Sequence, residues 1–489
     1  MKKFLFLLLF TMAVTAAIFA TGKSESQGKK GMDEIVFLTP DLHEFPEVHK
    51  AYGDAWKEIT GVRVKLKTVS NVDAETSMIA QFMAGEFPDV VKFGTENLNA
   101  LVRQEFIVPL DEYIEKSPGM SALKKKFPSS FEAHSVNGIT YGIPQRVGSM
   151  RGIWIRTDIL DALNLPMPTT IDEFVYTLKE IRDNYPGVDG KAIFPYVSKT
   201  YHSGYMGVLS NYFDISLDPI MKRPGDTKYR DGWDSPQFKD YADFVKMLWD
   251  EKLIDPDHAL PQPAAKTRSK FYSGNAALIS MWAYRYSEML PEVRKQFPDA
   301  EIAMIPPIKN PKGGILGVSV LPGYRPLCIT SECEDPEFVF KNFIEPMYLT
   351  VEGAMFHWRG IENIHYKIQD NMFVPNFEET GVVMGVEAPL NPDIEFPYTL
   401  SPLLQRGAEI EQEFGVWFSE NSKYGIAEEP TVSLPAFEII KEDLKDKKNQ
   451  LFWTYVLGKL SFADLTSQYE AYKDEIGFDD ILNELNSTI

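Results

Sequence analysis

The strongest constraint on the fold is an alternation of strand patterns and helix patterns early in the chain. A short apolar run at 35–38 precedes a stretch at 46–60 whose apolar residues are spaced for one helix face. Alternating residues follow at 62–69, then a second helix pattern at 78–84 and a third strand pattern at 89–93. Strand–helix–strand–helix–strand order is typical of an α/β layer with a parallel sheet. We therefore predict an α/β fold.

The alternation returns later in the chain with a change of register. A strand pattern at 153–155 leads to a helix opened by Thr170, with Glu173 three residues later in the spacing of a capping box. A long amphipathic helix at 235–251 and a buried strand at 276–280 follow. Two α/β halves built from separated stretches predict two lobes joined by more than one crossing. The expected crossings are near 145–150 and 308–317, and the expected division is 34–147 plus 315–365 for the first lobe and 148–314 plus 366–489 for the second.

This fold class predicts where a ligand binds. A ligand of an α/β protein lies at the carboxyl ends of the strands, where loops converge. The loops concerned are 39–45, 93–97, 145–151 and 282–286. The last one offers three aromatic side chains, from Trp282 to Tyr286, for pyranose rings and one guanidinium for hydroxyls or a carboxylate. The alternative, in which Trp282 and Tyr284 pack under the sheet edge, stays open.

The composition narrows the classes of function. Across 489 residues, 70 acidic side chains outnumber 50 basic ones, and the net charge of −20 disfavours nucleic acids and anionic membrane surfaces as partners. Aromatic residues make up 13% of the chain, an excess that sugar-binding proteins often show and that large cores also show. No glycine-rich phosphate loop and no G-x-S-x-G elbow occurs in the sequence, so no catalytic residue is assigned.

The first thirty residues have the pattern of an export signal. Lys2 and Lys3 precede an apolar run that continues to Ala20 and closes in small residues. We expect residues 1–20 to be a signal peptide cleaved near Ala20, with an uncleaved anchor as the alternative, and residues 21–33 to be a flexible leader. No cysteine follows the apolar run, so lipid attachment at a new N-terminal cysteine is not expected.

Two residue clusters invite comparison with metal and disulfide motifs. His43 and His49 stand six residues apart instead of four, and Pro46 interrupts an ordinary helix between them, so a zinc site is disfavoured. A polar loop that follows the first strand and contacts ligand is the preferred interpretation. Cys328 and Cys333 allow either a short disulfide or two separate core residues, and the sequence does not decide between them.

Several ordered segments resemble a known family. They are MIAQFMAGEFPDV at 78–90, NGITYGIP at 137–144, IRTDILD at 155–161, EKLIDPD at 251–257, FYSGNAA at 271–277 and RGIENIHY at 359–366. In this order they resemble the bacterial extracellular solute-binding proteins of family 1, and most closely the long LipO/LplA-like branch that includes alginate-oligosaccharide-binding proteins. The resemblance implies a two-lobed, type II periplasmic-binding-protein (Venus-flytrap) fold with discontinuous lobes. It also implies a monomeric receptor, not an enzyme, that hands an oligosaccharide to an ABC permease.

The chain departs from the family pattern in two places. Many relatives carry a calcium loop after the capping-box helix, but the stretch at 183–191 does not place oxygen ligands at alternate positions. Structural calcium is therefore doubtful, and no other cofactor is expected. The missing lipid cysteine indicates a freely soluble protein on the periplasmic, extracytoplasmic side of the membrane.

The candidate ligand-binding residues lie in or near the expected cleft segments. They are Asp41, His43, Glu44, Glu96, Arg146, Tyr201, Trp282, Tyr284, Arg285, Trp358 and Arg359. Arginine forks, with Arg151 as a further one, suit carboxylate or sulfate groups and also bind neutral hydroxyls, so the charge of the sugar stays open. An exported carbohydrate-active enzyme, either a glycoside hydrolase or a lyase, is the alternative function. A surface adhesin without a small ligand is a third.

Overall fold

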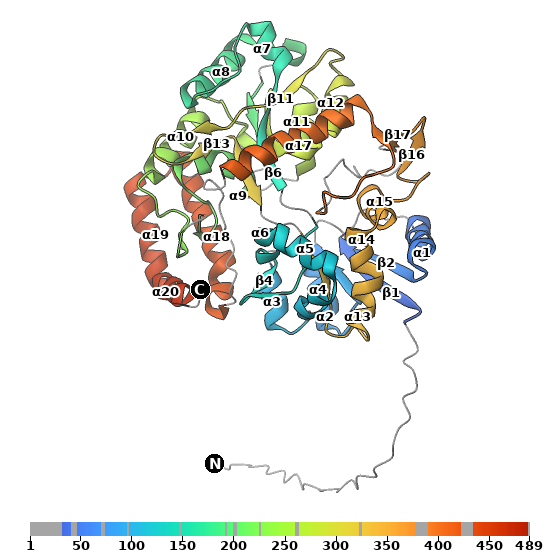
Figure 1. Ribbon diagram of the computed structural model, residues 1–489. Coiled ribbons are helices and arrows are strands. Elements are labelled where there is room, and N and C mark those ends of the chain that lie inside the picture. The colour runs from blue at the N-terminus through green and yellow to red at the C-terminus, as the bar shows by residue number, and fades with distance from the viewer. Residues whose placement is uncertain are drawn as a thin grey trace, which may run out of the picture.

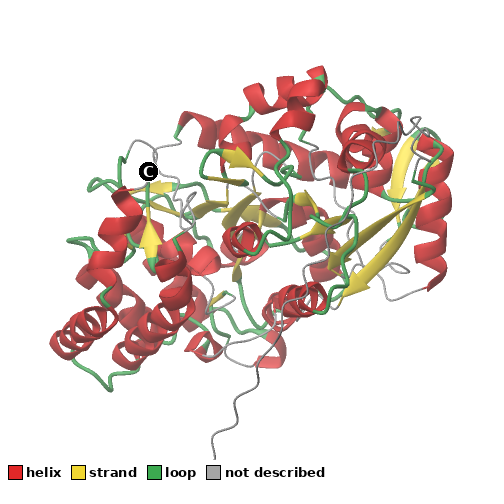
Figure 2. Ribbon diagram, turned by 90° about the horizontal axis from the view of Figure 1, so that it is seen from below, coloured by secondary structure: helices red, strands yellow, loops and turns green. Residues whose placement is uncertain are grey.

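In the computed structural model the chain forms two lobes, each built on its own sheet (Figure 1). The residues described are 32–40, 46–69, 74–94, 97–145, 149–190, 193–198, 203–223, 226–259, 264–321, 325–376, 390–421 and 434–487. Figure 2, which views the molecule from below, shows the strands flanked by helices. Within these residues we find no helix that combines the length and the apolar character needed to cross a bilayer.

The first lobe is built on a four-stranded sheet in the order β15-β3-β1-β2. Its strands are β1 (Glu34–Pro40), β2 (Arg63–Val69), β3 (Val90–Lys92) and β15 (Leu327–Ile329). β1 pairs in parallel with both β2 and β3, whereas β15 comes from far along the chain and pairs antiparallel with β3. The predicted α/β layer is confirmed, with α1 (Pro46–Thr60) as its first helix.

Helices from two distant parts of the chain cover this sheet. The earlier part comprises α2 (Ala74–Met83), α3 (Leu98–Arg103), α4 (Asp111–Lys116), α5 (Pro118–Lys126) and α6 (Pro128–Glu132), followed by the short strands β4 (Ser135–Val136) and β5 (Ile139–Thr140). The later part comprises α13 (Pro336–Val339), the π-helical turn Phe340–Ile344, α14 (Glu345–Leu349) and α15 (Val351–Arg359). Trp56 on α1 joins the two parts. Its ring lies 5.3 Å from that of Phe343 and 4.9 Å from that of Phe356, and its Nε1 donates to the carbonyl of Asn342 at 3.1 Å.

The second lobe has a five-stranded sheet around the long strand β6 (Ser149–Arg156). β6 pairs antiparallel with β10 (Leu278–Trp282), β11 (Ile302–Met304) and β14 (Val318–Leu321). β7 (Tyr196–Val197) pairs in parallel with β10. Each lobe is thus a mixed sheet with helices around it, in agreement with the expected two-lobed α/β class.

The boundary expected at 315 is corrected by the strand pairing. Residues 315–321 were assigned to the first lobe, yet β14 pairs with β6, and the amide of Gly317 donates to the carbonyl of Val208 at 2.8 Å. The segment 308–317, expected as a crossing, contains the hairpin of β12 (Ile308–Lys309) and β13 (Ile315–Leu316). The return to the first lobe therefore follows residue 321. An apolar strand pattern does not reveal which of two sheets the strand joins.

A second correction concerns the segment after 366, which was assigned wholly to the second lobe. Leu390 is fully buried in the core of the first lobe, and Asn391 Nδ2 donates to the carbonyl of Tyr348 at 2.9 Å. Asp393 forms an ion pair with Lys126 at 3.1 Å. One apolar side chain and two polar contacts therefore hold 390–393 on the first lobe.

The remaining elements of the second lobe include the predicted capping box. Thr170 accepts from the amide of Glu173 at 3.1 Å, and the Glu173 carboxylate accepts from the amide of Thr170 at 3.2 Å, as predicted. The elements are α7 (Thr157–Leu163), α8 (Ile171–Asn184), the 3₁₀ turn Val188–Gly190, α9 (Ser203–Ser210), the 3₁₀ turn Asn211–Phe213, β8 (Ile220–Met221), β9 (Arg230–Asp231), α10 (Phe238–Asp250), the 3₁₀ turn Pro256–Ala259, α11 (Ala264–Tyr272), the 3₁₀ turn Ala283–Arg285 and α12 (Tyr286–Arg294).

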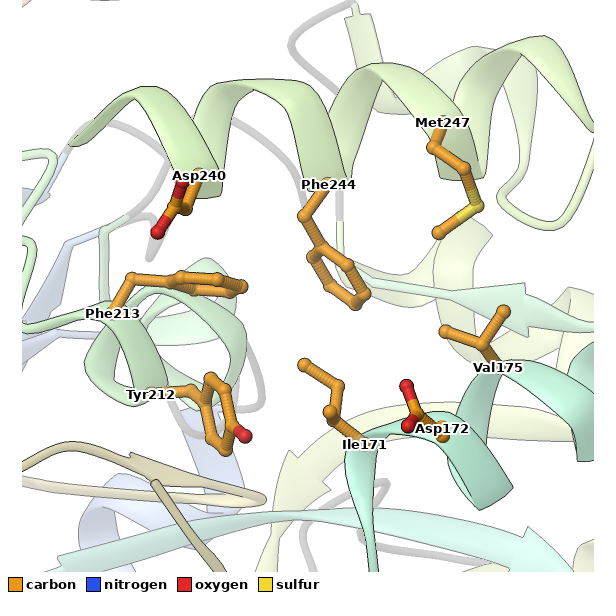
Figure 3. A pocket seen from close by; sticks show the side chains of 8 residues that line it. All are labelled: Ile171, Asp172, Val175, Tyr212, Phe213, Asp240, Phe244 and Met247. Carbon is orange, nitrogen blue, oxygen red and sulfur yellow. The ribbon is translucent and has the colours of Figure 1, made fainter. Parts of the chain in front are cut away.

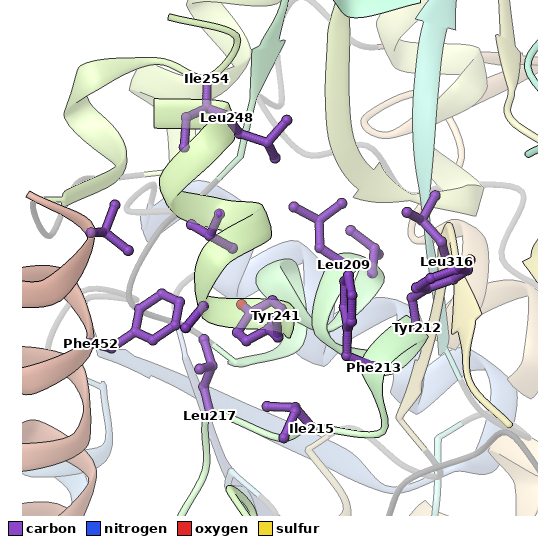
Figure 4. Packing of buried hydrophobic residues seen from close by; sticks show 14 of the residues in the cluster. Leu209, Tyr212, Phe213, Ile215, Leu217, Tyr241, Leu248, Ile254, Leu316 and Phe452 are labelled. Atoms are coloured by element: carbon purple, nitrogen blue, oxygen red, sulfur yellow. The ribbon is translucent and has the colours of Figure 1, made fainter. Parts of the chain in front are cut away.

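A surface hollow of about 360 Å³ lies on the second lobe, between α8, α10 and the turn at 211–213. Figure 3 shows its lining, which is Ile171, Asp172, Val175, Tyr212, Phe213, Asp240, Phe244 and Met247. None of the predicted site residues belongs to this set. Beneath this hollow, side chains of α10 pack in the apolar core of the lobe (Figure 4).

The C-terminal elements add a small sheet and four helices. They are β16 (Tyr366–Gln369), β17 (Met372–Pro375), β18 (Thr399–Leu400), α17 (Pro402–Glu420), α18 (Pro435–Val456), α19 (Phe462–Ile476) and α20 (Phe478–Ser487). α17 packs on α12, and α18 packs on α10. Phe452 of α18 stacks on Tyr241 of α10 at 5.3 Å, so the last helices complete the core of the second lobe.

A cluster that we term the C-terminal clamp (Asp231, Trp233, Lys448 and Tyr469) anchors these helices. Lys448 Nζ lies 5.2 Å from the centre of the Trp233 ring and donates to Asp231 Oδ1 at 3.1 Å, and the side chain of Lys448 is 1% exposed. The hydroxyl of Tyr469 donates to the other carboxylate oxygen of Asp231 at 2.7 Å. The clamp thus joins the segment at 231–233 to two consecutive C-terminal helices that are more than 200 positions away in sequence.

The two cysteines are separate core residues. Cys328 lies inside β15, Cys333 lies just beyond it, and both thiols are free and buried. Burial raises the pKa of each thiol to about 12, so neither is a reactive thiolate at neutral pH. Of the two interpretations that the sequence left open, the structure supports the second.

Candidate functional site

The chain passes between the two lobes just before β6 and just after β14. Both passages reach the second sheet at the same edge. At Ile143 the chain still belongs to the first lobe, because Ile143 and Leu327 of β15 exchange backbone hydrogen bonds at 2.9 and 3.0 Å. β6 begins at Ser149, and Ser149 stands opposite Leu321, the last residue of β14. This edge of the second sheet therefore faces the junction of the two lobes.

An arginine and a tryptophan stand opposite each other close to this edge. In the antiparallel register of β6 and β10, Arg151 is the partner of Trp282. Directly opposed residues of a strand pair project to the same face of the sheet. Two residues separate Arg151 from the start of β6, which is roughly 7 Å along the strand. The carboxyl end of β10 thus presents Trp282 where ligand loops were expected.

The three side chains Arg151, Trp282 and Tyr284 form a column that we term the Arg151 stack. The Arg151 guanidinium carbon lies 3.8 Å from the centre of the Trp282 ring. The Trp282 and Tyr284 rings are 5.9 Å apart and inclined by 22°, an offset stack. Arg151 is 7% exposed and Trp282 is 8% exposed, whereas Tyr284 is only partly buried. The Trp282 ring also contacts the apolar cluster around Ile279, so it is packed as well as stacked.

Arg285, a predicted site residue beside this column, pairs with a carboxylate of the protein. Its guanidinium forms an ion pair with Glu288, one helical turn away on α12. The same carboxylate accepts from the Tyr272 hydroxyl at 3.2 Å and lies 3.8 Å from Arg268. The i, i+3 spacing at the start of α12 favours this local pair.

The first lobe contributes Trp358, another predicted site residue, near the carboxyl end of its sheet. The neighbouring His357 lies close enough to Lys92, the last residue of β3, to sense its charge. Burial, the larger cause, and the positive charge of Lys92 lower the pKa of His357 to about 3. Trp358 is 6% exposed, and its Nε1 has no hydrogen-bond partner among the described residues. The same is true of Gln145 Nε2, beside the first crossing.

Arg359 contacts the small C-terminal sheet and the segment that leads into its last strand. Its Nε donates to the Tyr398 hydroxyl at 2.5 Å, and its guanidinium lies 4.6 Å from the Phe396 ring and 5.7 Å from the Phe373 ring. At 3% exposure this side chain joins α15 to the 366–400 region. The structure thus brings Trp282 and Tyr284 together and places Arg285 and Arg359 in separate polar settings.

Six predicted site residues lie outside the described part of the chain. They are Asp41, His43, Glu44, Glu96, Arg146 and Tyr201. The signal segment 1–20 and leader residues 21–31 also lie outside it. The roles assigned to all of these from the sequence stay predictions.

The structure adds Arg151 as a member of the candidate site. Its place in a cleft loop was visible in the sequence, but its contact with Trp282 depends on the pairing of strands 131 positions apart. No sequence pattern signals such a register. The Lys92–His357 neighbourhood was missed for the same reason, because it joins two distant segments of the first lobe.

A metal centre finds no support in the part of the chain that is described. There, no three side chains of His, Cys, Asp or Glu are arranged to hold an ion. In the stretch at 183–191, Asp183 accepts two hydrogen bonds of 2.7 Å from Arg182, which engages both of its oxygens. Near the lobe edge the described residues offer stacked aromatic rings, guanidinium groups and hydrogen-bond donors.

Comparison with known proteins identifies the family. The family model for bacterial extracellular solute-binding proteins matches residues 39–344, which is more than half of the chain. The polygalacturonan/rhamnogalacturonan-binding protein YtcQ of Bacillus subtilis is 26% identical over 284 residues, covering 56% of this chain and 55% of YtcQ. The chain thus spans about half the length of that relative. Lipoprotein LipO of Bacillus subtilis is 24% identical over 391 residues, covering 76% of this chain and 75% of LipO.

Solved structures agree on the fold. The alginate-binding protein AlgQ2, solved without calcium ion, superposes with a TM-score of 0.67 at 19% identity. The match covers 94% of this chain and 98% of that one. At this identity the likeness establishes the two-lobed architecture and leaves the ligand to be argued from the site.

Proposed function

The chain belongs to the family of bacterial extracellular solute-binding proteins, and we propose that its solute is an oligosaccharide. We propose further that the oligosaccharide binds between the two lobes and is delivered to an ABC importer. The observation that carries this proposal is the Arg151 stack, which lies where both chain crossings meet the second sheet. Aromatic faces and buried donors at a lobe junction are what sugar capture requires.

The chemistry of the edge suits a sugar ring. The apolar face of a pyranose covers roughly 80–100 Å² of an aromatic ring, and this burial contributes about 2 kcal/mol. Tyr284 offers a partly exposed ring for this purpose. Trp358 Nε1 and Gln145 Nε2, which have no partner among the described residues, supply donors for sugar hydroxyls from the other lobe.

An acidic oligosaccharide is the favoured ligand class. The names of two similar proteins refer to polygalacturonan and alginate, which are polysaccharides of uronic acids. A guanidinium binds a carboxylate through two parallel hydrogen bonds, which an ammonium cannot do. Arg151 stands at the edge that we assign to the ligand, so a uronic acid residue has a partner there.

The family and the N-terminal sequence support a proposal about where the protein works. We propose that the signal segment 1–20 directs export and that the protein works as a freely soluble monomer on the outer side of the inner membrane. Its partners are then the sugar and the permease subunits of the importer. An exported carbohydrate-active enzyme is the competing function, although the similar proteins with assigned roles are binding proteins.

Calorimetric titration with neutral, uronic and sulfated oligosaccharides tests the proposal. We expect one-to-one binding of a uronic oligosaccharide, no new products on thin-layer chromatography, and a smaller radius of gyration in solution scattering as the lobes close. Failure of every oligosaccharide to bind, or turnover of the bound sugar by pure protein, contradicts it.

A further inference from the structure

The surface hollow of the second lobe, of about 360 Å³, has an apolar floor and an acidic rim. Figure 3 shows Phe244 from α10 and Ile171 from α8 pointing toward each other across it. Asp240 and Asp172 lie on opposite sides of this pair (Figure 3). Both acidic residues are exposed, and the two apolar residues are only half-buried, so they still meet solvent. An exposed apolar surface with a polar rim is typical of a protein–protein contact.

The back of the hollow is rigidly packed. Tyr212 and Phe213 are 8% and 7% exposed, and the centres of their rings are 5.1 Å apart. The Phe213 ring in turn lies 5.4 Å from that of Phe244. Asn310 Nδ2 donates to the carbonyl of Tyr212 at 2.7 Å and thereby ties this turn to the hairpin of β12 and β13. Because the core already holds these side chains in place, an occupant loses little affinity to reordering the surface.

The carboxylates at the rim favour a positively charged occupant. Burial, the larger cause, and the negative charge of Asp172 raise the pKa of Tyr212, so this charge acts across the hollow. Asp240 pairs with Lys312 at 3.2 Å, but the two side chains are 55% and 66% exposed. Such a pair contributes little and can be exchanged for a cation of a partner. Both acids also lie in the first turn of their helices, where a negative charge stabilises the helix, so a control has to separate the two roles.

The size of the hollow suits one side chain. Its volume is near the lower end of the roughly 300–1,000 Å³ that is typical of cavities for small ligands. None of the predicted sugar-site residues lines it. The apolar floor matches a side chain such as leucine or phenylalanine, and the two carboxylates match a basic residue on either side of it. A protein segment with this order of residues therefore fits the hollow better than a sugar does.

We propose that this hollow is a docking surface for the permease of the importer, which inserts an apolar side chain flanked by arginine or lysine residues. The inference rests on the proposed delivery to an ABC importer and adds the surface and the chemistry of that contact. The net charge of −20 on the chain speeds its encounter with a basic segment. None of the three residues of the Arg151 stack lines the hollow, so docking and sugar binding can be measured separately.

The first test measures how the protein, loaded with trigalacturonate, stimulates the ATPase of its importer in proteoliposomes. Val175→Arg fills the hollow with a bulky cation, so the concentration needed for half-maximal stimulation should rise about tenfold. Asp172→Lys reverses one rim charge, should have an effect of about fivefold, and is the second variant if Val175→Arg does not fold. Asp480→Lys makes the same reversal in the first turn of α20, outside the hollow, and should leave the stimulation unchanged.

The second test measures the chemistry of the occupant with a capped peptide that has one leucine between two arginines. Its counterpart carries citrulline, which has nearly the same shape as arginine and no charge. The methyl signal of Met247, which lines the hollow, reports the contact in NMR spectra. The arginine peptide should shift this signal at millimolar concentration, and the citrulline peptide should bind about tenfold more weakly. Binding of the arginine peptide should weaken with added salt and in Asp172→Lys, but not in Asp480→Lys.

The outcomes distinguish this inference from the proposed function. Calorimetric affinity for trigalacturonate should be the same in all three variants and the wild type. Normal ATPase stimulation by the folded hollow variants, or equal shifts with the two peptides, overturns the docking surface and leaves oligosaccharide binding intact. A wild-type protein that binds no oligosaccharide contradicts the proposed function instead, and the peptide titration then still decides whether the hollow takes a basic, apolar segment.

Discussion

Among the residues that the structure describes, two buried cations lie on tryptophan rings, and they differ in what surrounds them. Lys448 lies over Trp233 and is bound by the Asp231 carboxylate inside the second lobe. Arg151 lies over Trp282 at the edge where the chain crosses between the lobes. The same interaction, a cation over an indole ring, therefore occurs in two different surroundings. Over Trp233 the cation pairs with a carboxylate of the protein and anchors the C-terminal helices, whereas over Trp282 it lies at the lobe edge, where we propose that the sugar binds.

The largest effect is expected from breaking the C-terminal clamp. Asp231→Asn leaves the positive charge of Lys448 buried without its carboxylate, so the free energy of unfolding should fall by roughly 3–5 kcal/mol. Urea denaturation measures this loss. Sugar affinity well below the melting temperature should not change, because the clamp lies inside the second lobe. A stability loss under 1 kcal/mol would show that the clamp does not anchor the helices.

Acid should weaken the fold without touching the Arg151 stack. His134 in the first lobe is fully buried, and burial lowers its pKa to about 4, below the ordinary value near 6.5. Between these values the unfolded chain binds a proton that the folded chain excludes, so stability is lost as the pH falls from 6.5 towards 4.

This histidine should account for a loss of about 2 kcal/mol between pH 7 and pH 5. His134→Gln should therefore show a smaller drop in unfolding free energy over that interval than the wild type. The affinity for a uronic oligosaccharide at pH 5 should match that at pH 7, because His134 is fully buried in the first lobe and does not belong to the Arg151 stack. Equal pH slopes for variant and wild type would count against a neutral buried His134.

A milder change at Trp282 should separate binding from packing. Trp282→Phe keeps an aromatic ring in the apolar cluster but removes part of the ring surface that contacts the Arg151 guanidinium and that we assign to the sugar. We expect about tenfold weaker binding of trigalacturonate, which is about 1.4 kcal/mol, with a smaller loss of stability. Trp282→Ala is less informative, because emptying a site that is 8% exposed also costs folding energy. Unchanged affinity in Trp282→Phe would remove the ring from the site.

The smallest effect is expected where a cation is exposed. Lys295 pairs with Glu292 at 2.6 Å, yet its side chain is 69% exposed. Lys295→Met should change the unfolding free energy by less than about 0.5 kcal/mol and leave sugar affinity alone. A large effect here would mean that burial is not what separates the two cations on tryptophan from ordinary surface pairs.

Local features of the fold were readable from the sequence. The helix at 46–60 and the capping box of Thr170 and Glu173 occur where their patterns predict them. Each depends on residues within a few positions of one another. The candidate site could be predicted only in part, since Trp282 and Tyr284 are two positions apart in the sequence and stack in space, whereas Arg151 reaches Trp282 only through strand pairing.

The sequence by itself determined the α/β class, the two-lobed plan and the aromatic loop after β10. These depend on hydrophobic periodicity, which each segment carries in its own residues. The tertiary structure alone decided that β14 joins the second sheet, that 390–393 packs on the first lobe and that Arg151 lies on Trp282. The physical reason is that strand register and lobe assignment are chosen by contacts between distant segments, and an apolar strand pattern fits either sheet equally well.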